Sequence, residues 1–472
     1  MNVIMKFGGT SVADADAMTR IVEIVKAQLE QHSGARPPVV VVSAMSKVTD
    51  RLVEAGRLAG ERQGAAAAQI LADLLARHAG VVRALVHGAA LDALLQQLAL
   101  EFDELGSAVA ASAAEGDVSP RVTDAILSMG ELASSRIVSA AFASRGLPST
   151  WVDARKVLVT DAEHTAAVPD MDATCARAHA LVEPETAAGR IPVLGGFIGA
   201  SADGVTTTLG RGGSDYSAAI FGACLDVDEI QIWTDVDGML TADPRVVKYP
   251  ILVPRLSFAE ASELAYFGAK VLHPSTILPA VAKNIPVRIL NSRRPEVPGT
   301  MITAEGRADG GALTALACKR GVTVIDITST RMLMAHGFLR RLFEVFERFK
   351  TPVDVVTTSE VSVSVTIDDT RRLNDIVDNL RHFAEVGCEP DMAIVSAVGE
   401  NLRSDPALFV RAVTALDRIA LRLVSQAAGR RNITLVLRDA DVPDAMQRLH
   451  EAFFATAARV APAAAAHEAR SR

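Results

Sequence analysis

The first 300 residues alternate short apolar runs with longer stretches of helical periodicity. The short runs predict buried strands, whereas segments such as 15–31 and the Ala- and Leu-rich 52–112 predict helices. The strand runs are 3–5, 39–42, 191–194 and 229–233. This alternation is typical of an α/β domain with a mostly parallel sheet sandwiched by helices, whose ligands bind outside the carboxyl ends of the strands. The polar residues that follow each strand are therefore the best candidates for a site.

The last third of the chain has a different pattern. Proline and glycine cluster between residues 295 and 312, which predicts a linker. After it, the order strand, helix, strand, strand, helix occurs twice, so we predict two α+β units in tandem. The first helix of this region has apolar residues at helical spacing, which predict one buried face: Leu339, Leu342, Phe343, Phe346 and Phe349. The predicted bounds are 1–300 for the α/β domain, 301–312 for the linker, 313–386 and 387–457 for the two units, and 458–472 for an Ala-rich disordered tail.

Composition narrows the class of protein. A length of 472 residues is too great for one core, and a net charge of −8 argues against a nucleic-acid binder. No apolar run approaches 18 residues, so we expect no membrane-spanning helix and no membrane partner. The four cysteines are far apart and form no C-x-x-C, so we expect neither a zinc site nor a disulfide framework, and a reducing cytoplasm fits.

The segment Lys6–Ser11 directly follows the first predicted strand and precedes a helix. Gly8 and Gly9 let backbone N–H groups approach an anion closely, and a helix N-terminus favours negative charge. Lys6 adds a full positive charge. The segment therefore predicts a corner that binds phosphate.

A second segment, Thr206–Tyr216, places Arg211 among glycines ahead of another helix. A guanidinium on a glycine-rich turn suits bidentate capture of a carboxylate or phosphate. Asp215 then has three open roles: it orients Lys6, positions Mg²⁺, or only caps the helix. Neither a Walker A motif nor G-x-G-x-x-G is present, which removes the main evidence for a P-loop or Rossmann site.

Taken together, these segments resemble those of the aspartate kinases of the amino-acid kinase superfamily. The matching strings, in the family's order, are KFGGTS at 6–11, VSA at 42–44, GEL at 130–132, GGFIG at 195–199, TTTLGRGGSDYS at 206–217, WTD at 233–235 with DPR at 243–245, and FGAKVLHP at 267–274. The C-terminal third resembles paired, ferredoxin-like ACT regulatory domains through Gly337–Leu339 and Val353–Val361. The resemblance implies a kinase that uses ATP and Mg²⁺ to phosphorylate L-aspartate, and a homodimer or larger homo-oligomer assembled through its ACT domains.

The resemblance also assigns roles to residues. The implied catalytic residues are Lys6 and Asp215. The implied aspartate site is Thr49, Glu131, Arg211, Gly212, Gly213 and Ser214. The implied ATP site is Lys6, Gly8, Gly9, Thr234, Asp235, Leu240, Arg245, Lys270 and Val271, with Leu240 standing where related enzymes can carry a tyrosine. No residue is expected to form a resident metal centre.

The regulatory third resembles that of lysine-sensitive enzymes most closely. The implied effector contacts are Met332, Gly337, Phe338, Leu339, Asp354, Ser359 and Glu360. Ala335 stands where such enzymes can have a serine, so threonine, another effector or no effector stays open. Two other functions also stay open: a kinase for glutamate, acetylglutamate or UMP, and an inactive amino-acid sensor.

The chemistry of a carboxylate acceptor agrees with these residues. The β-carboxylate of aspartate has a pKa near ~4, so it is ionised at neutral pH and needs no general base. Catalysis then reduces to bringing two anions together and neutralising charge on the γ-phosphoryl group. Lys6, Arg211 and glycine N–H groups suit that task, with Arg211 expected on the α-carboxylate and Glu131 on the α-ammonium.

Overall fold

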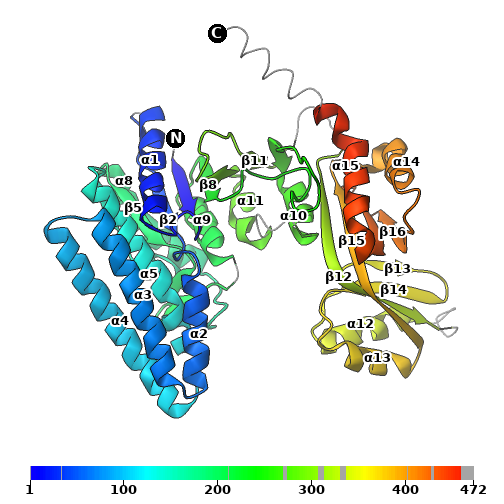
Figure 1. The fold of residues 1–472 in the computed structure, drawn as a ribbon, viewed down its shortest axis with the longest axis horizontal. Coiled ribbons are helices and arrows are strands. Elements are labelled where there is room, and N and C mark those ends of the chain that lie inside the picture. The colour runs from blue at the N-terminus through cyan, green and yellow to red at the C-terminus, as the bar shows by residue number, and fades with distance from the viewer. Residues whose placement is uncertain are drawn as a thin grey trace, which may run out of the picture. The chain divides into compact units, whose positions relative to one another are not determined.

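The computed structural model describes residues 2–32, 34–210, 212–268, 274–306, 313–329, 336–400, 402–426 and 430–458. The chain divides into two compact units (Figure 1). The first contains residues 1–239, 254–258 and 271–305, and the second contains 240–253, 259–270 and 306–472. We call them the catalytic unit and the regulatory unit. The predicted domain bounds remain predictions.

The catalytic unit is built on an eight-stranded sheet in the order β3-β5-β2-β1-β8-β10-β11-β9. All neighbouring strands are parallel except the antiparallel pair β10 and β11. Its strands are β1 Val3–Phe7, β2 Val39–Val42, β3 Ser149–Trp151, β5 Ile191–Gly195, β8 Glu229–Thr234, β9 Arg255–Ser257, β10 Val287–Asn291 and β11 Thr300–Thr303. A small second sheet contains β4 Val159–Thr160, β6 Ile198–Ser201 and β7 Thr206–Thr208. The predicted α/β fold is thereby confirmed.

Helices cover this sheet. They are α1 Ala15–Gln31, α2 Val48–Gly60, α3 Gly64–Leu85, α4 Ala89–Glu115, α5 Pro120–Ser144, α6 Ala154–Val157, α7 Met171–Leu181, α8 Glu183–Ala187, α9 Gly213–Cys224 and α11 Leu278–Ala282. Helices α2 to α5 lie side by side as a bundle (Figure 1). Helices predicted over 52–112 are present, and left-handed backbone at Arg62 and Gly88 separates them into three that pack against one another.

Helix α3 is the one helix among the described residues that is long and apolar enough to cross a membrane, judged by length and composition alone. It contacts α2, α4 and α5 of the bundle. The Nδ1 of its buried His78 donates a hydrogen bond to the carbonyl of Leu74 at 2.7 Å.

The regulatory unit is built on one six-stranded antiparallel sheet in the order β13-β14-β12-β15-β17-β16. Its elements are β12 Ala315–Thr328, α12 Phe338–Arg348, β13 Val356–Thr358, β14 Ser362–Ile367, α13 Leu373–Arg381, β15 Glu385–Val398, α14 Pro406–Ala415, β16 Leu423–Gln426, β17 Asn432–Arg438 and α15 Val442–Ala458. The helix α10, Phe258–Tyr266, packs with this unit except for its first residue. The twofold strand–helix repeat is as predicted, and its two halves share a sheet because β12 pairs with β15 along its length.

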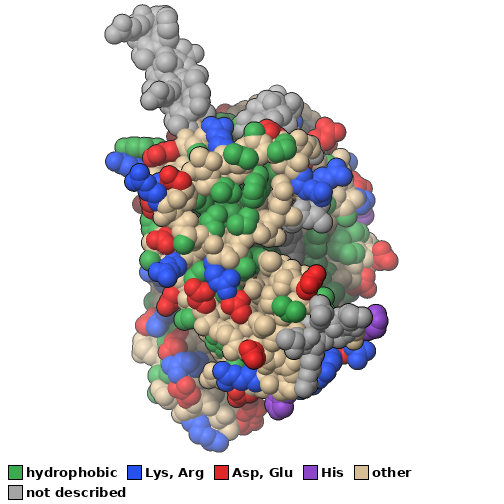
Figure 2. All heavy atoms as spheres, turned by 90° about the vertical axis from the view of Figure 1, so that its right-hand side faces the viewer, with side chains coloured by type: hydrophobic (Ala, Val, Ile, Leu, Met, Phe, Trp, Pro, Cys, Tyr) green, Lys and Arg blue, Asp and Glu red, His purple; other side chains and the backbone are tan. Residues whose placement is uncertain are grey.

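The buried stripe of α12 differs from the predicted one. Phe338, Leu342, Val345 and Phe346 are buried. Leu339 and Phe343 are instead 41% and 37% exposed, because the buried stripe is turned by about one position from the predicted face. Figure 2 shows the side of the regulatory unit, where hydrophobic side chains gather in one area and charges of both signs are mixed over the rest.

Candidate active site

The carboxyl ends of the central strands meet at one edge of the catalytic sheet, as predicted. Past the end of β1, Gly8 donates its N–H to the carbonyl of Trp233 on β8 at 2.9 Å. Past the end of β2, Ser43 donates its N–H to the carbonyl of Phe7 at 3.0 Å. Past the end of β5, Gly196 donates its N–H to the carbonyl of Val42 at 2.8 Å. The glycine and hydroxyl segments are thus fixed relative to one another by backbone hydrogen bonds.

Lys6 and Asp215 form an ion pair at this edge. The Lys6 Nζ lies 2.5 Å from Asp215 Oδ1, and the two side chains are only 8% and 17% exposed. Lys6 comes from the middle of the sheet and Asp215 from the first turn of α9, so strand and helix N-terminus converge. Of the three roles left open for Asp215, this contact favours orienting Lys6.

The start of α9 packs closely against the backbone that follows β5. A Cβ at Gly196 would lie 2.6 Å from the Cβ of Ser214, so only glycine fits there. Gly212 caps the helix in the left-handed conformation, with φ of 72°. The Ser214 hydroxyl hydrogen-bonds the Ser43 hydroxyl at 2.9 Å. Gly212, Gly213 and Ser214, three of the predicted aspartate-binding residues, therefore lie over the carboxyl ends of β2 and β5.

Glu131 supplies a buried carboxyl group to the same region. It lies on α5, where its Cβ and backbone would contact a Cβ placed at Gly195. Burial raises the pKa of Glu131 to about 8, although hydrogen bonds from the backbone N–H of Ala44 and the charge of Lys6 act in the other direction. Its Oε2 has no hydrogen-bond partner among the described residues. A buried oxygen of this kind is suited to accept a hydrogen bond from a bound cation.

Thr49 also belongs to this part of the unit. It lies in the first turn of α2, two positions after the N-cap residue Lys47, which has left-handed backbone with φ of 64°. Arg211 lies outside the described residues, between the described Gly210 and Gly212.

The predicted ATP residues fall into three groups. Gly8, Gly9, Thr234 and Asp235 belong to the catalytic unit, and the carbonyl of Thr234 accepts the N–H of Ser292 at 2.9 Å. Leu240 and Arg245 belong to the regulatory unit, where Arg245 pairs with Asp243 at 2.6 Å. Lys270 and Val271 lie outside the described residues.

The predicted effector residues lie in the first half of the regulatory sheet. Gly337 has left-handed backbone and caps α12, Phe338 is buried, and Leu339 is exposed. Asp354 precedes β13, whereas Ser359 and Glu360 follow it, in the turn to β14. Asp354 and Ser359 thus lie at opposite ends of β13, and the effector site stays a prediction. Met332 and residues 459–472 of the predicted tail lie outside the described residues.

Sequence reasoning missed a buried carboxylate on the same helix as Glu131. Asp124 on α5 is fully buried and lies two helical turns before Glu131. It accepts hydrogen bonds from Thr208 Oγ1 at 2.5 Å and the Thr165 N–H at 3.1 Å, and it contacts His164 Nδ1 at 2.6 Å. It thereby ties the Glu131 helix to the strand that leads to Gly210. The sequence alone does not predict this contact, because a single Asp in a helical segment is common.

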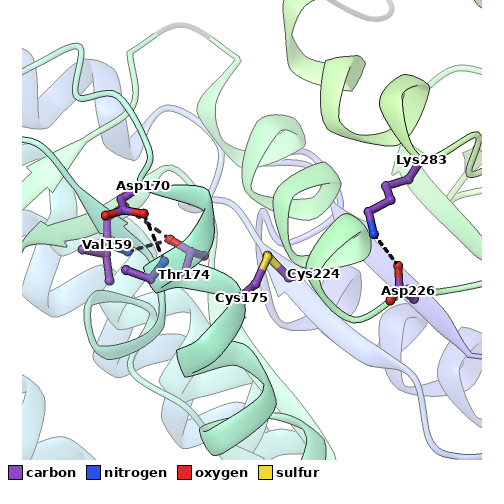
Figure 3. Close-up of a disulfide and its surroundings, with 8 residues drawn as sticks. Val159, Asp170, Thr174, Cys175, Cys224, Asp226 and Lys283 are labelled. Atoms are coloured by element: carbon purple, nitrogen blue, oxygen red, sulfur yellow. Dashed lines mark hydrogen bonds and ion pairs between the residues drawn. A yellow bond between two sulfur atoms is a disulfide. The ribbon is translucent and has the colours of Figure 1, made fainter.

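The prediction of no disulfide is wrong. Cys175 on α7 and Cys224 at the end of α9 are bonded, with Cα atoms 4.6 Å apart (Figure 3). They are 49 residues apart in sequence, so their spacing gave no indication of the bond. Nearby, Thr174 Oγ1 accepts the N–H of Val159 at 3.0 Å, which anchors α7 to β4. The disulfide thus joins the helix that carries Asp215 to a neighbour that is itself anchored.

Comparison with known proteins identifies the family. Residues 1–291 match the amino acid kinase family, and residues 395–453 match the ACT domain. Aspartokinase 1, chloroplastic, of Arabidopsis thaliana is 36% identical over 466 residues, which cover 96% of this chain and 80% of that protein. This chain belongs to the aspartokinase family.

A further relative and a solved structure agree with that identification. Lysine-sensitive aspartokinase 3 of Escherichia coli (strain K12) is 35% identical over 466 residues, covering 96% of this chain and 99% of that aspartokinase. The crystal structure of E. coli aspartokinase III in complex with aspartate and ADP matches with a TM-score of 0.81 at 33% identity, covering 96% of this chain and 100% of that one. The predicted family and the predicted fold, an amino-acid kinase domain with C-terminal ACT domains, are confirmed.

Proposed function

We propose that this chain transfers the γ-phosphoryl group of ATP to the β-carboxylate of L-aspartate, giving 4-phospho-L-aspartate and ADP. In the transfer a β-carboxylate oxygen forms the new bond to phosphorus, and the bond between that phosphorus and the bridging oxygen of ADP breaks. The observation that carries the proposal is the Lys6–Asp215 pair at the strand edge, next to the buried carboxyl group of Glu131. A fixed cation suits a phosphoryl group, and a buried carboxyl group beside it, which ionises when it pairs with an ammonium, suits an amino acid.

Each part of the site has a task in this reaction. Lys6, held by Asp215, neutralises charge on the transferring phosphoryl group, and the N–H groups of Gly8 and Gly9 contact phosphate oxygens. Glu131 binds the α-ammonium of aspartate, while Ser214, Thr49 and Arg211 bind its carboxylates. Thr234, Asp235, Leu240, Arg245, Lys270 and Val271 remain the proposed nucleotide contacts.

Magnesium would reach this site with the nucleotide. The described residues contain no group of three or more His, Cys, Asp or Glu side chains able to hold a metal ion. Mg²⁺ that arrives with ATP would be held mainly by phosphate oxygens and water, with few protein ligands. The ion would neutralise charge on the phosphates.

A substrate panel tests the proposal. Purified chain with Mg²⁺ and ATP should release ADP when L-aspartate is present, and hydroxylamine should trap the acyl phosphate as aspartyl hydroxamate. Glutamate, acetylglutamate and UMP replace aspartate in parallel reactions. ADP release with one of these and not with aspartate would assign a different amino-acid kinase, and no ADP release with any would favour the inactive sensor.

The regulatory unit is proposed to bind lysine as a feedback inhibitor of this first step toward lysine, threonine and methionine. Asp354 already holds an alkylammonium group, that of Lys319 at 2.7 Å, so its carboxylate can recognise the ammonium of an amino acid. The lysine-sensitive relative supports lysine over threonine. Initial rates measured against millimolar lysine and threonine decide between them.

A homodimer or larger homo-oligomer through the regulatory unit is proposed as well. Exposed apolar side chains lie on α12 and at the sheet edge that β13 forms: Leu339, Phe343, Val356 and Val361. Light scattering tests this assembly by comparing the molecular mass of the wild type with that of Leu339→Glu. If the apolar side chains form the interface, the variant should have the smaller mass.

A further inference from the structure

The buried carboxylate of Asp124 joins three segments of the catalytic unit. Its side chain on α5 is 0% exposed. Oδ1 accepts the Thr208 hydroxyl of β7 at 2.5 Å, both oxygens accept the Thr165 N–H at 3.1 Å, and Oδ2 lies 2.6 Å from Nδ1 of His164. A buried charge is costly without such partners, so these contacts fix the three segments relative to one another.

The loop 161–168, which supplies two of these partners, is closed on itself. The N–H of Asp161 donates to the carbonyl of Val168 at 3.0 Å, and the Asp161 carboxylate accepts the N–H of Val168 at 3.0 Å. The loop is also attached to β7, because the N–H of Ala167 donates to the carbonyl of Thr208 at 2.9 Å. It therefore holds the end of β7 from a second side.

The same loop lies against the turn that enters α9. Gly210 has left-handed backbone with φ of 75°, and a Cβ there would lie 3.3 Å from the carbonyl oxygen of Thr165. The carbonyl of Gly210 accepts the N–H of Gly213, the first residue of α9, at 3.1 Å. The contacts of Asp124 therefore fix the backbone that leads to the proposed carboxylate-binding residues.

Asp124 and Glu131 stand at two contact points of one helix. They are about 10 Å apart along the axis of α5 and on nearly the same side of it, because they are two helical turns apart. At Glu131 the helix packs on the end of β5, where a Cβ at Gly195 would lie 3.1 Å from the Glu131 Cβ. At Asp124 it is bonded to the end of β7.

These contacts form a closed frame around the proposed aspartate site. One side is α5 from Glu131 to Asp124, and another is the end of β7 with the turn into α9, which reaches Ser214. The backbone after β5 joins the two, because Gly196 packs on Ser214. The groups proposed for the ammonium and the carboxylates of one amino acid thus lie on different sides of the frame. Aspartate and glutamate differ by one methylene between those charges, so the spacing of the sides decides which one fits.

We propose that Asp124 is a positioning residue that sets the spacing between Glu131 and the Gly212–Ser214 turn, and that it thereby makes the site select aspartate over glutamate. This inference rests on the proposed kinase activity and deepens it, since it names a residue that determines the acceptor. Asp124 acts through α5 and β7 and need not touch the substrate.

Asp124→Asn is the first test because it keeps the size of the side chain. One acceptor oxygen becomes a donor, so Thr208, Thr165 and His164 cannot all keep their bonds. We expect the KM for aspartate to rise about tenfold or more, with the KM for ATP within about twofold of wild type. The preference for aspartate over glutamate in kcat/KM should fall about tenfold, which is within the range that one methylene provides. Asp103→Asn, on an exposed position of α4, is the control.

Thr208→Val is the second test, and it decides the matter if Asp124→Asn does not fold. It removes one donor to Asp124 and keeps the shape of the side chain, so the same two changes should appear at about threefold to tenfold. Thr123→Val is its control, because the Thr123 hydroxyl donates within its own helix end, to the carbonyl of Ser119 at 3.2 Å. Thermal melting confirms that each variant folds.

Two results would overturn the positioning role. One is a folded Asp124→Asn or Thr208→Val protein with the wild-type KM for aspartate and the wild-type preference over glutamate. The other is an equal rise of the KM for aspartate and for ATP with that preference unchanged, which would show a general effect on the fold.

The failure of this inference and that of the proposed function are distinguishable. Wild-type protein that releases no ADP with aspartate refutes the proposed function. Wild-type protein that is active with aspartate, while the variants keep its preference, refutes only the role of Asp124. Wild-type protein that uses glutamate as readily as aspartate refutes the selection.

Discussion

Each unit of this protein contains a buried pair of lysine and aspartate, and the two pairs are built in opposite ways. In the catalytic unit the lysine is the more buried partner, with Lys6 8% and Asp215 17% exposed. In the regulatory unit the carboxylate is the more buried partner, with Lys319 20% and Asp354 3% exposed. Asp215 fixes a cation that faces anions, whereas Lys319 neutralises a carboxylate that can accept another cation.

The difference shows how one type of contact can serve two tasks. A charge whose partner holds it in place at a strand edge is preorganised, so it stabilises a transition state without rearrangement. Lys319 divides its single charge between Asp354 and Asp368, so the two carboxylates are not fully neutralised and Asp354 can pair with a further cation. The first arrangement suits catalysis and the second suits regulation.

The largest effect should come from removing the catalytic cation. Lys6→Ala is expected to lower kcat by about 10³-fold or more, because charge on the transferring group loses its fixed partner. Lys319→Ala, the equivalent change in the regulatory pair, should change basal kcat by about threefold or less in a folded protein. Steady-state ADP release measures both, and near-normal turnover of Lys6→Ala would contradict the catalytic assignment.

The next effect concerns the buried carboxyl group of Glu131. Because its pKa is raised to about 8, most of the free enzyme holds the protonated form at pH 7, whereas the substrate ammonium requires the ionised form. The KM for aspartate should therefore fall by up to about tenfold per pH unit as the pH rises from 6.5 toward 8. Above about pH 8 it should level off.

Glu131→Gln is the control for that pH dependence. It should raise the KM for aspartate by about 10²-fold and abolish the slope, since a neutral amide cannot pair with the ammonium. The KM for ATP should change little. A pH slope that survives in Glu131→Gln would assign the titration to another group.

The smallest effect on turnover should come from the disulfide, which only the catalytic unit contains among the described cysteines. Reduction, or Cys175→Ser, should lower the melting temperature by a few degrees, because a cross-link over 49 residues restricts the unfolded chain and contributes roughly 2–4 kcal/mol. Cys388→Ser is the control, because Cys388 is exposed and free. Calorimetry with and without dithiothreitol makes the comparison, and equal melting temperatures would show that the bond adds no stability.

The local sequence pattern was enough to predict the fold and those residues of the candidate site that lie at the ends of strands. Lys6, Gly8 and Ser214 sit directly beside strand or helix termini, and parallel strands bring such termini to one edge whatever the rest of the chain does. Glu131 needed the family resemblance, since the sequence places it at the opening of a helix, where an acidic residue is ordinary, whereas the structure places it in the middle of α5.

The sequence by itself determined the family, the alternating α/β order and the repeated regulatory unit, because each rests on short-range periodicity and on motifs of a few residues. Only the tertiary structure decided the Cys175–Cys224 bond, the role of Asp124 and the contact between Tyr266, Lys319 and Asp354. These contacts join residues 35 to 88 positions apart, and their formation depends on how helices and sheets pack. A side chain's partner at that separation leaves no local pattern in the chain, because packing alone brings the two together.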